Sequence, residues 1–210
     1  MKRVALSILI ATLALGLAES STSRELRFAV LLDDHEVGSH RFQIVEQDGK
    51  RRVQSDFRLT VKFLFIEAYN YMHQARKQWR GNCLEAIESR TDDNGERLAV
   101  SGTRNGDRFQ VVANDARLDG PSCVMSFAYW NPVILRQPRL INAQTGELKE
   151  VRVEPLGKET IMVRDTPAVA SRYALHGRNL RIDIWYALGD QWVQLESRTD
   201  SGRVLRYRIQ

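Results

Sequence analysis

The fold class follows from the stretch YNYMHQARKQW, residues 69–79. Side chains that alternate in character with a period of two lie on opposite faces of a β-strand. The face that carries most of the large rings comprises Tyr69, Tyr71, His73, Ala75, Lys77 and Trp79. The positions between them are mostly polar, and this alternation is typical of an antiparallel strand with one buried face.

The same period of two recurs along most of the chain, for example over residues 26–32 and 180–186. Short segments rich in Gly, Asn and Asp separate the alternating stretches, and such segments form β-turns. The clearest of these segments are residues 47–49, 93–95, 105–107, 176–179, 187–190 and 200–202. The pattern predicts an all-β protein with a single curved antiparallel sheet, or open half-barrel, of about ten meander strands.

Residues 121–140 depart from this pattern because they contain Pro121, Pro132 and Pro138. Proline has no N–H group to donate, so this segment is not a central strand. We expect a short helical or irregular lid segment across the mouth of the sheet. Trp130 is expected to pack inward because its exposure would forfeit several kcal/mol of burial. The Asn131 side chain is expected to hold the turn.

The first eighteen residues have the order of a secretory signal peptide. Lys2 and Arg3 precede an apolar run over residues 4–17, and small residues follow at positions 16 and 18. We predict cleavage between Ala18 and Glu19, leaving residues 19–210 as a single domain in the periplasm or secreted. That product would be soluble, without a lipid anchor and not membrane-spanning. The alternative is an uncleaved anchor or an amphipathic first helix.

Cys83 and Cys123 are the two cysteines of the chain. In an oxidising compartment an even number of cysteines favours a disulfide bond, here closing a loop of about forty residues and worth roughly 3–4 kcal/mol. The alternative is a reactive thiol. We predict the disulfide because neither cysteine belongs to a CxxC motif.

The composition and motifs give no sign of an enzyme. The chain lacks a GxSxG nucleophile motif and an HExxH metal motif, so we expect no catalytic residue, no cofactor and no metal. The histidines His35, His40, His73 and His176 are scattered and are interpreted as surface or strand residues. The net charge of +5 suits a solvated surface or an anionic lipid surface better than nucleic acid, which we do not expect as a partner.

Large apolar side chains on the concave face of the sheet are the candidates for ligand binding. They are Phe57, Leu59, Tyr71, Trp79, Tyr129, Trp130 and Trp185. Two interpretations stay open: the residues fill a core, or they line an open barrel that takes an apolar ligand. The first corresponds to an envelope protein-interaction or assembly module that binds a protein partner. The second corresponds to a carrier of a lipid or other apolar small molecule.

Several stretches also carry a family likeness. They are residues 28–38, 63–79, 84–95 and 129–146, with Trp185-Tyr186 and Trp192-Val193. With them the chain resembles an uncharacterised family of exported Gram-negative bacterial proteins, known as a domain of unknown function. That family is distantly similar to periplasmic half-barrels such as the outer-membrane lipoprotein carriers. The resemblance implies a curved antiparallel sheet under a helical lid, and it transfers no catalytic residues.

Overall fold

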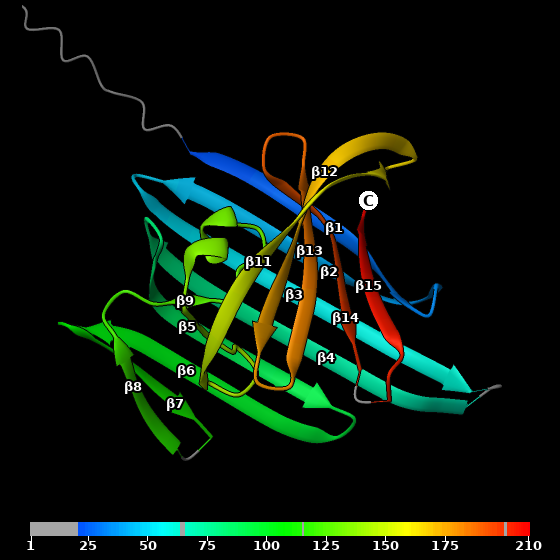
Figure 1. Cartoon of the computed structure of the whole chain (residues 1–210). Helices are drawn as coiled ribbons and strands as arrows, with labels where there is room; N and C mark the ends of the chain where they lie inside the picture. The colour runs from blue at the N-terminus through cyan, green and yellow to red at the C-terminus, as the bar shows by residue number, and fades with distance from the viewer. Residues whose placement is uncertain (1–20, 64–65, 115, 200) are drawn as a thin grey trace, which may run out of the picture.

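The computed structural model describes residues 21–63, 66–114, 116–199 and 201–210 (Figure 1). They form one 15-stranded sheet and a short 3-10 helix. The strands of the first half are β1 (Thr22–Leu32), β2 (His35–Gln47), β3 (Lys50–Phe63), β4 (Ile66–Arg80), β5 (Cys83–Asp93), β6 (Glu96–Asn105), β7 (Arg108–Ala113) and β8 (Ala116–Pro121). The elements of the second half are β9 (Met125–Ser126), η1 (Pro132–Arg136), β10 (Arg139–Ile141), β11 (Leu148–Val163), β12 (Thr166–Gly177), β13 (Leu180–Ala187), β14 (Gln191–Arg198) and β15 (Val204–Ile209).

The two halves of the sheet join through the first and last strands. The spatial order runs from β8 down to β1, then from β15 down to β9. Neighbouring strands are antiparallel except β9 and β10, which are parallel. In Figure 1 the strands β11–β15 cross in front of β2–β6, so the sheet folds over and encloses its inner face. The described ladder ends at β8 and β9 without closing into a barrel.

The prediction of about ten strands was too low, partly because the segment predicted as a lid contains the short strands β9 and β10, and partly because two of the tight turns carry no glycine. Asp33-Asp34 connects β1 to β2 with φ angles of 47° and 68°. Arg164-Asp165 connects β11 to β12 with φ angles of 47° and 61°. Positive φ at both central residues is the geometry of a type I′ hairpin turn, which usually selects Asn or Gly. The all-β class and the open antiparallel sheet were predicted correctly.

Aromatic rings fill the space between the two halves of the folded sheet. The Phe28 ring lies 4.0 Å from that of Trp192, and the Phe42 ring lies 5.5 Å from it. The largest fully buried side chains also include Trp79 on β4 and Phe109 on β7, both in the first half of the sheet. Packed rings of this kind account for much of the apolar area that stabilises a sheet.

The predicted short helical turn is present as η1, and the residue before its cap packs on the inner face of the sheet. Trp130 is 3% exposed, and its ring meets that of Trp79 edge-on at 5.6 Å. The Asn131 side chain caps η1 by accepting from the Val133 N–H at 3.1 Å. It also donates to the Asn82 side chain at 3.1 Å. The inward position of Trp130 and the capping role of Asn131 are therefore confirmed.

The predicted disulfide is confirmed. Cys83 and Cys123 are bonded, with their Cα atoms 4.7 Å apart. A hydrogen bond from the Leu84 N–H to the Val124 carbonyl, 2.9 Å long, also attaches the start of β5 to the segment before β9. The predicted signal peptide and its cleavage site at Ala18 and Glu19 lie outside the described residues. Within the described part of the chain, no helix has the length and apolar character needed to cross a membrane.

Candidate functional site

A row of small side chains crosses the inner face of β3, β4 and β5. Ser55 pairs with Ala75, and Ala75 pairs with Ser89, so the three lie directly opposite one another on adjacent strands. All three are buried, with exposures of 3%, 2% and 6%. These side chains are shorter than their neighbours on the inner face. We call the set of Ser55, Ala75 and Ser89 the small-residue row.

Lys77 lies on one side of the small-residue row. It pairs with Val53 on β3 and with Ile87 on β5, both of which are buried. Only 7% of Lys77 is exposed. Among the described residues, no hydrogen bond or ion pair reaches its ammonium group. Burial lowers the pKa of Lys77 to about 8 because the charged form loses its hydration.

Two histidines lie on the other side of the row. His73 Nδ1 is 2.8 Å from the Thr91 hydroxyl, and His40 Nε2 is 2.9 Å from the Ser55 hydroxyl. Burial, and then the charge of Lys77, lowers the pKa of His73 to about 4. Burial also places the pKa of His40 well below its ordinary value, with smaller effects of His73 and Lys77. His40 Nδ1 is buried without a hydrogen-bond partner in the described structure.

Beyond the histidines, larger apolar and aromatic side chains follow the inner faces of β3 and β4 toward the hairpin that joins them. We call this set the aromatic lane; it comprises Phe57, Leu59, Val61, Tyr69 and Tyr71. Leu59 is buried, whereas the other four are only half-buried. The Phe57 ring lies 5.2 Å from the Tyr71 ring and 5.0 Å from that of His40.

Polar contacts hold the two tyrosines of the lane. The Tyr71 hydroxyl donates to the Gln144 side-chain oxygen at 3.2 Å, and the Tyr69 hydroxyl donates to Asp93 at 2.5 Å. Burial, helped by Asp93, raises the pKa of both phenols, so they stay neutral at physiological pH. These bonds orient the rings toward the inner face without adding charge to it.

The structure brings most of the predicted ligand-binding residues to the inner face, but in separate groups. Phe57, Leu59 and Tyr71 belong to the aromatic lane. Trp79 and Trp130 contact each other at the lid. Tyr129 lies between these groups, with its ring 5.3 Å from Trp192 and its carbonyl accepting the Tyr186 hydroxyl at 2.8 Å. Among the described residues, these groups do not line one shared apolar cavity.

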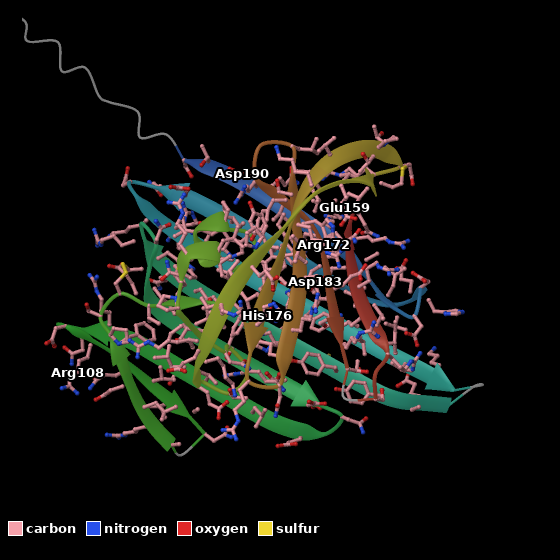
Figure 2. The ribbon with its side chains drawn as sticks, in the orientation of Figure 1. Arg108, Glu159, Arg172, His176, Asp183 and Asp190 are labelled. Atoms are coloured by element: carbon pink, nitrogen blue, oxygen red, sulfur yellow. A yellow bond between two sulfur atoms is a disulfide. The ribbon has the colours of Figure 1, made fainter. Side chains whose placement is uncertain are left out.

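Trp185 is 3% exposed and belongs to the hydrophobic core, but it lies away from the aromatic lane. Its indole N–H donates to Glu159 at 2.6 Å, and the Arg172 guanidinium lies over its ring, 4.8 Å from the centroid. Asp183, two residues earlier on β13, binds the same arginine. Glu159, Arg172 and Asp183 lie along the front strands in Figure 2. The sequence held the signal for this, because Trp185 alternates with Ile184 and shares its face with Asp183.

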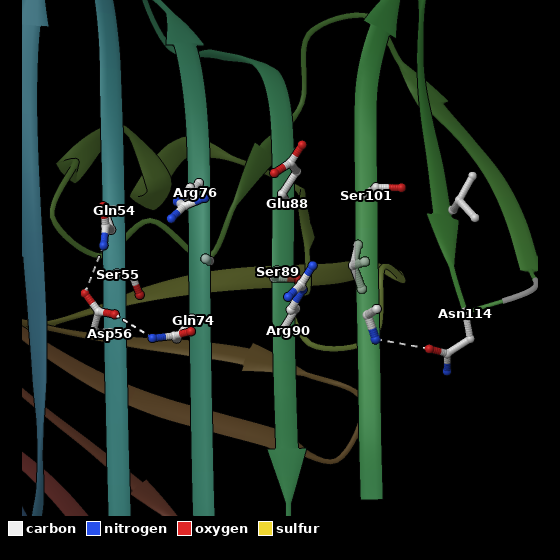
Figure 3. A pocket seen from close by; sticks show the side chains of 14 residues that line it. Gln54, Ser55, Asp56, Gln74, Arg76, Glu88, Ser89, Arg90, Ser101 and Asn114 are labelled. Atoms are coloured by element: carbon white, nitrogen blue, oxygen red, sulfur yellow. Dashed lines mark hydrogen bonds between the residues drawn. The ribbon is translucent and has the colours of Figure 1, made fainter.

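The pockets that the structure shows are polar. One of about 470 Å³ lies over β3–β7 (Figure 3), where Asp56 accepts the Gln74 side chain at 3.1 Å and Arg76 and Glu88 stand nearby. A second, of about 350 Å³, is lined at the rim by Arg51 and other residues beside Trp130. Polar side chains paired with each other are typical of a hydrated surface. These pockets therefore offer no apolar binding site.

Sequence reasoning missed three basic side chains of the inner face as parts of a candidate site: Lys77, His73 and His40. Lys77 and His73 share a strand face with Tyr71 and Trp79, and this shared face was visible in the alternation. His40 lacks such a signal, since only the pairing of β2 with β3 brings it opposite Phe57. Among the described residues, no group of three or more His, Cys, Asp or Glu side chains is placed to hold a metal ion.

Comparison with known proteins agrees with this architecture. A family model described as "Domain of unknown function (DUF6134)" matches residues 28–210. The chain belongs to this family. The DUF6134 chain is also similar to the crystal structure of a β-barrel-like protein of domain of unknown function DUF1849 from Brucella abortus. The two share 8% sequence identity and a TM-score of 0.57, with 89% of this chain and 94% of the other covered.

At that identity the likeness shows the fold alone. No curated protein matches the DUF6134 chain. The resemblance to an uncharacterised family with a barrel-like fold is thus confirmed. The likeness to lipoprotein carriers stays a prediction.

Proposed function

We propose that this protein is an exported, non-enzymatic binding or carrier module for a lipid or other apolar ligand, which lies along the aromatic lane. The observation that carries the proposal is the half-exposure of Phe57, Val61, Tyr69 and Tyr71 on the inner face of an open sheet. Elsewhere that face is packed with buried rings. A concave apolar surface with a few convergent polar groups is the usual form of a small-molecule site.

The shape of the sheet supports access to the lane. In Figure 1 the hairpin of β3 and β4 extends past the ends of β14 and β15, so the front strands leave part of its inner face uncovered. An alkyl chain laid there would shield the exposed ring surface at roughly 25 cal/mol per Å² of apolar area. Binding would then require no opening of the packed core around Trp79 and Trp192.

The disulfide supports an exported location. A bond such as Cys83–Cys123 persists in the periplasm or outside the cell and is rare in the reducing cytosol. Cleavage of the predicted signal peptide would deliver the chain to that compartment. The carrier would therefore work in the cell envelope or beyond it.

Binding of an uncharged apolar fluorophore, N-phenyl-1-naphthylamine, tests the carrier function. We expect the wild-type protein to bind it, and Phe57→Ala to weaken binding about tenfold through the loss of one ring contact. Met72→Ala is the matched control, because Met72 is 42% exposed and follows Tyr71 on the opposite face of β4. Absence of binding by the wild-type protein, together with no lipid in native mass spectra of envelope-purified protein, would refute the carrier function.

A second candidate is the envelope protein-interaction module, which an apolar surface on the β11–β12 hairpin favours. Met162 and Val169 are 60% and 65% exposed. Met162 pairs with Pro167 and Val169 pairs with Thr160, so the two side chains are diagonal neighbours on the same face of the hairpin. Exposed apolar groups of this kind mark protein contacts when they adjoin one another. Crosslinking in envelope preparations should then give adducts that a Met162→Glu, Val169→Glu double variant loses. Identical adducts with both proteins would exclude this surface.

A further inference from the structure

We propose that Lys77 binds the carboxylate head of a single-chain amphiphile whose tail lies along the aromatic lane. The tail rests on the carrier function proposed above, whereas the head-group site rests on the geometry around Lys77 alone. The ligand class is therefore a fatty-acid-like monocarboxylate.

The first argument is the unpaired charge. Lys77 is more than nine-tenths buried, and its ammonium has no hydrogen-bond or ion-pair partner among the residues that the structure describes. Buried lysines are nearly always paired, because an unpaired ammonium loses its hydration without compensation. An anionic group of a ligand supplies the missing partner.

The second argument is the small size of the side chains beside Lys77. The small-residue row of Ser55, Ala75 and Ser89 lies next to it and separates it from His73. Lys77 and His73 lie two positions on either side of Ala75 on the same face of β4, and the charge of Lys77 lowers the pKa of both His73 and His40. His40 Nδ1 is buried without a hydrogen-bond partner in the described structure, and the His40 ring lies 5.7 Å from that of Tyr207.

The third argument is the net charge of Lys77, His40 and His73, which favours a ligand head group with a single negative charge. His40 and His73 are neutral at pH 7, so Lys77 carries the one positive charge of this group. A carboxylate would balance it, whereas a phosphate dianion would leave an uncompensated negative charge. Phosphate sites also favour the bidentate guanidinium of arginine. The arginine on this face of β3, Arg51, is already paired with Glu46 at 3.0 Å.

The fourth argument is continuity between the head site and the lane. Lys77 pairs with Val53, and the lane continues along β3 to Val61, the partner of Tyr69. Eight residues of strand cover about 26 Å at roughly 3.3 Å per residue. A single extended alkyl chain with its head at Lys77 would therefore follow the inner face from the interior to the open end.

Binding of dodecanoate and of its uncharged methyl ester tests the head-group site. At pH 7 we expect the wild-type protein to bind dodecanoate about 30-fold more tightly than the ester, since a hydrogen bond to a charged group is lost in the ester. Lys77→Met should remove this preference by weakening dodecanoate and leaving the ester unchanged. Lys158→Met is the matched control, because Lys158 is exposed on the β11–β12 hairpin and should keep the preference.

A titration of the wild-type protein with acetate separates the head from the tail. Acetate has no alkyl tail, and its binding should shift the NMR signals of the Lys77 side chain. Equal binding of dodecanoate and ester, with no acetate shift at Lys77, would overturn the head-group site and leave the carrier function standing. An acetate shift without binding of either alkyl compound would support the site and overturn the carrier. Absence of all binding would overturn both.

Discussion

Two buried charges on this sheet have opposite surroundings. Asp183 on the outer face of β13 and Lys77 on the inner face of β4 are each 7% exposed. Asp183 accepts hydrogen bonds from Arg172 at 2.5 Å and from Arg181 at 3.1 Å. Burial acts to raise the pKa of Asp183, but these hydrogen bonds outweigh it, and the pKa is lowered.

Lys77 has no such partner in the described structure, and burial lowers its pKa to about 8. The Asp183 charge therefore stabilises the folded state, whereas burial of the Lys77 charge lowers the free energy of unfolding. Unsatisfied titratable groups of the second kind are concentrated at functional sites. The two residues should therefore respond with opposite sign to the removal of their charge.

The largest expected effect is the loss of the paired charge. Asp183→Ala should lower the free energy of unfolding by about 3 kcal/mol, because it leaves two arginines without their shared carboxylate. Urea unfolding at pH 7 measures this difference. Asp119→Ala is the control: Asp119 pairs with Arg108 at 3.2 Å, but the pair is exposed and should contribute less than about 1 kcal/mol. Equal effects of the two variants would contradict the special role of Asp183.

The removal of the unpaired charge should have the opposite sign. Lys77→Met should raise the free energy of unfolding by about 2 kcal/mol at pH 7, because a lysine whose pKa falls from 10.5 to about 8 pays for burial of its charge. The gain should start to fall as the pH rises above 8, where the folded wild-type lysine loses its proton, and should vanish only above about 10.5, where the unfolded chain loses it too. Destabilisation by Lys77→Met at pH 7 would show that the ammonium has a stabilising partner.

A smaller effect should appear in mild acid. His73 titrates near its ordinary pKa of 6.5 in the unfolded chain but at about 4 when folded, so the unfolded chain binds more protons between these values. The free energy of unfolding should therefore fall by about 1 kcal/mol from this group between pH 7 and 5.5. His40, whose pKa is also lowered, adds to this loss of stability. Lys77 stays charged over this pH range, and the phenols Tyr71 and Tyr207 stay neutral.

Thermal unfolding of His73→Gln over this pH range checks the third prediction. The variant should show a flatter dependence on pH than the wild type, whereas His35→Gln, which changes an exposed ring, should not. Parallel curves for wild type and His73→Gln would mean that His73 is not the group responsible.

The strands with strong alternation were predictable, and the tight turns without glycine were not. Residues 69–79 lie within β4 as the alternation indicates. The β11–β12 hairpin was missed because Arg164-Asp165 adopts positive φ without a glycine or asparagine to signal it. The disulfide was predictable because the number of cysteines and the expected compartment leave few alternatives.

The candidate site was predictable only in part, because a sequence pattern assigns residues to faces but does not say which face is enclosed. Tyr71 and Phe57 were recognised by their size, whereas Lys77 on the same face drew no attention because lysine is usually exposed. Trp185 was assigned to the ligand-binding face by size alone, although its own strand placed it with Asp183; it is buried, but away from the aromatic lane. The meeting of His40 with Ser55 depends on the pairing of β2 with β3, which no local pattern reveals.

The disulfide at the start of β5 also determines how a pulling force would travel through the molecule. The bond encloses the strands β5 to β8 within a covalent loop whose ends are 40 residues apart. A chain stretched from its two termini would therefore extend about 140 Å less than the reduced chain, at roughly 3.5 Å per hidden residue. Tension would pass from Cys83 through the disulfide to Cys123 and on toward η1. The strands β6, β7 and β8, which lie inside the loop, would carry none of it.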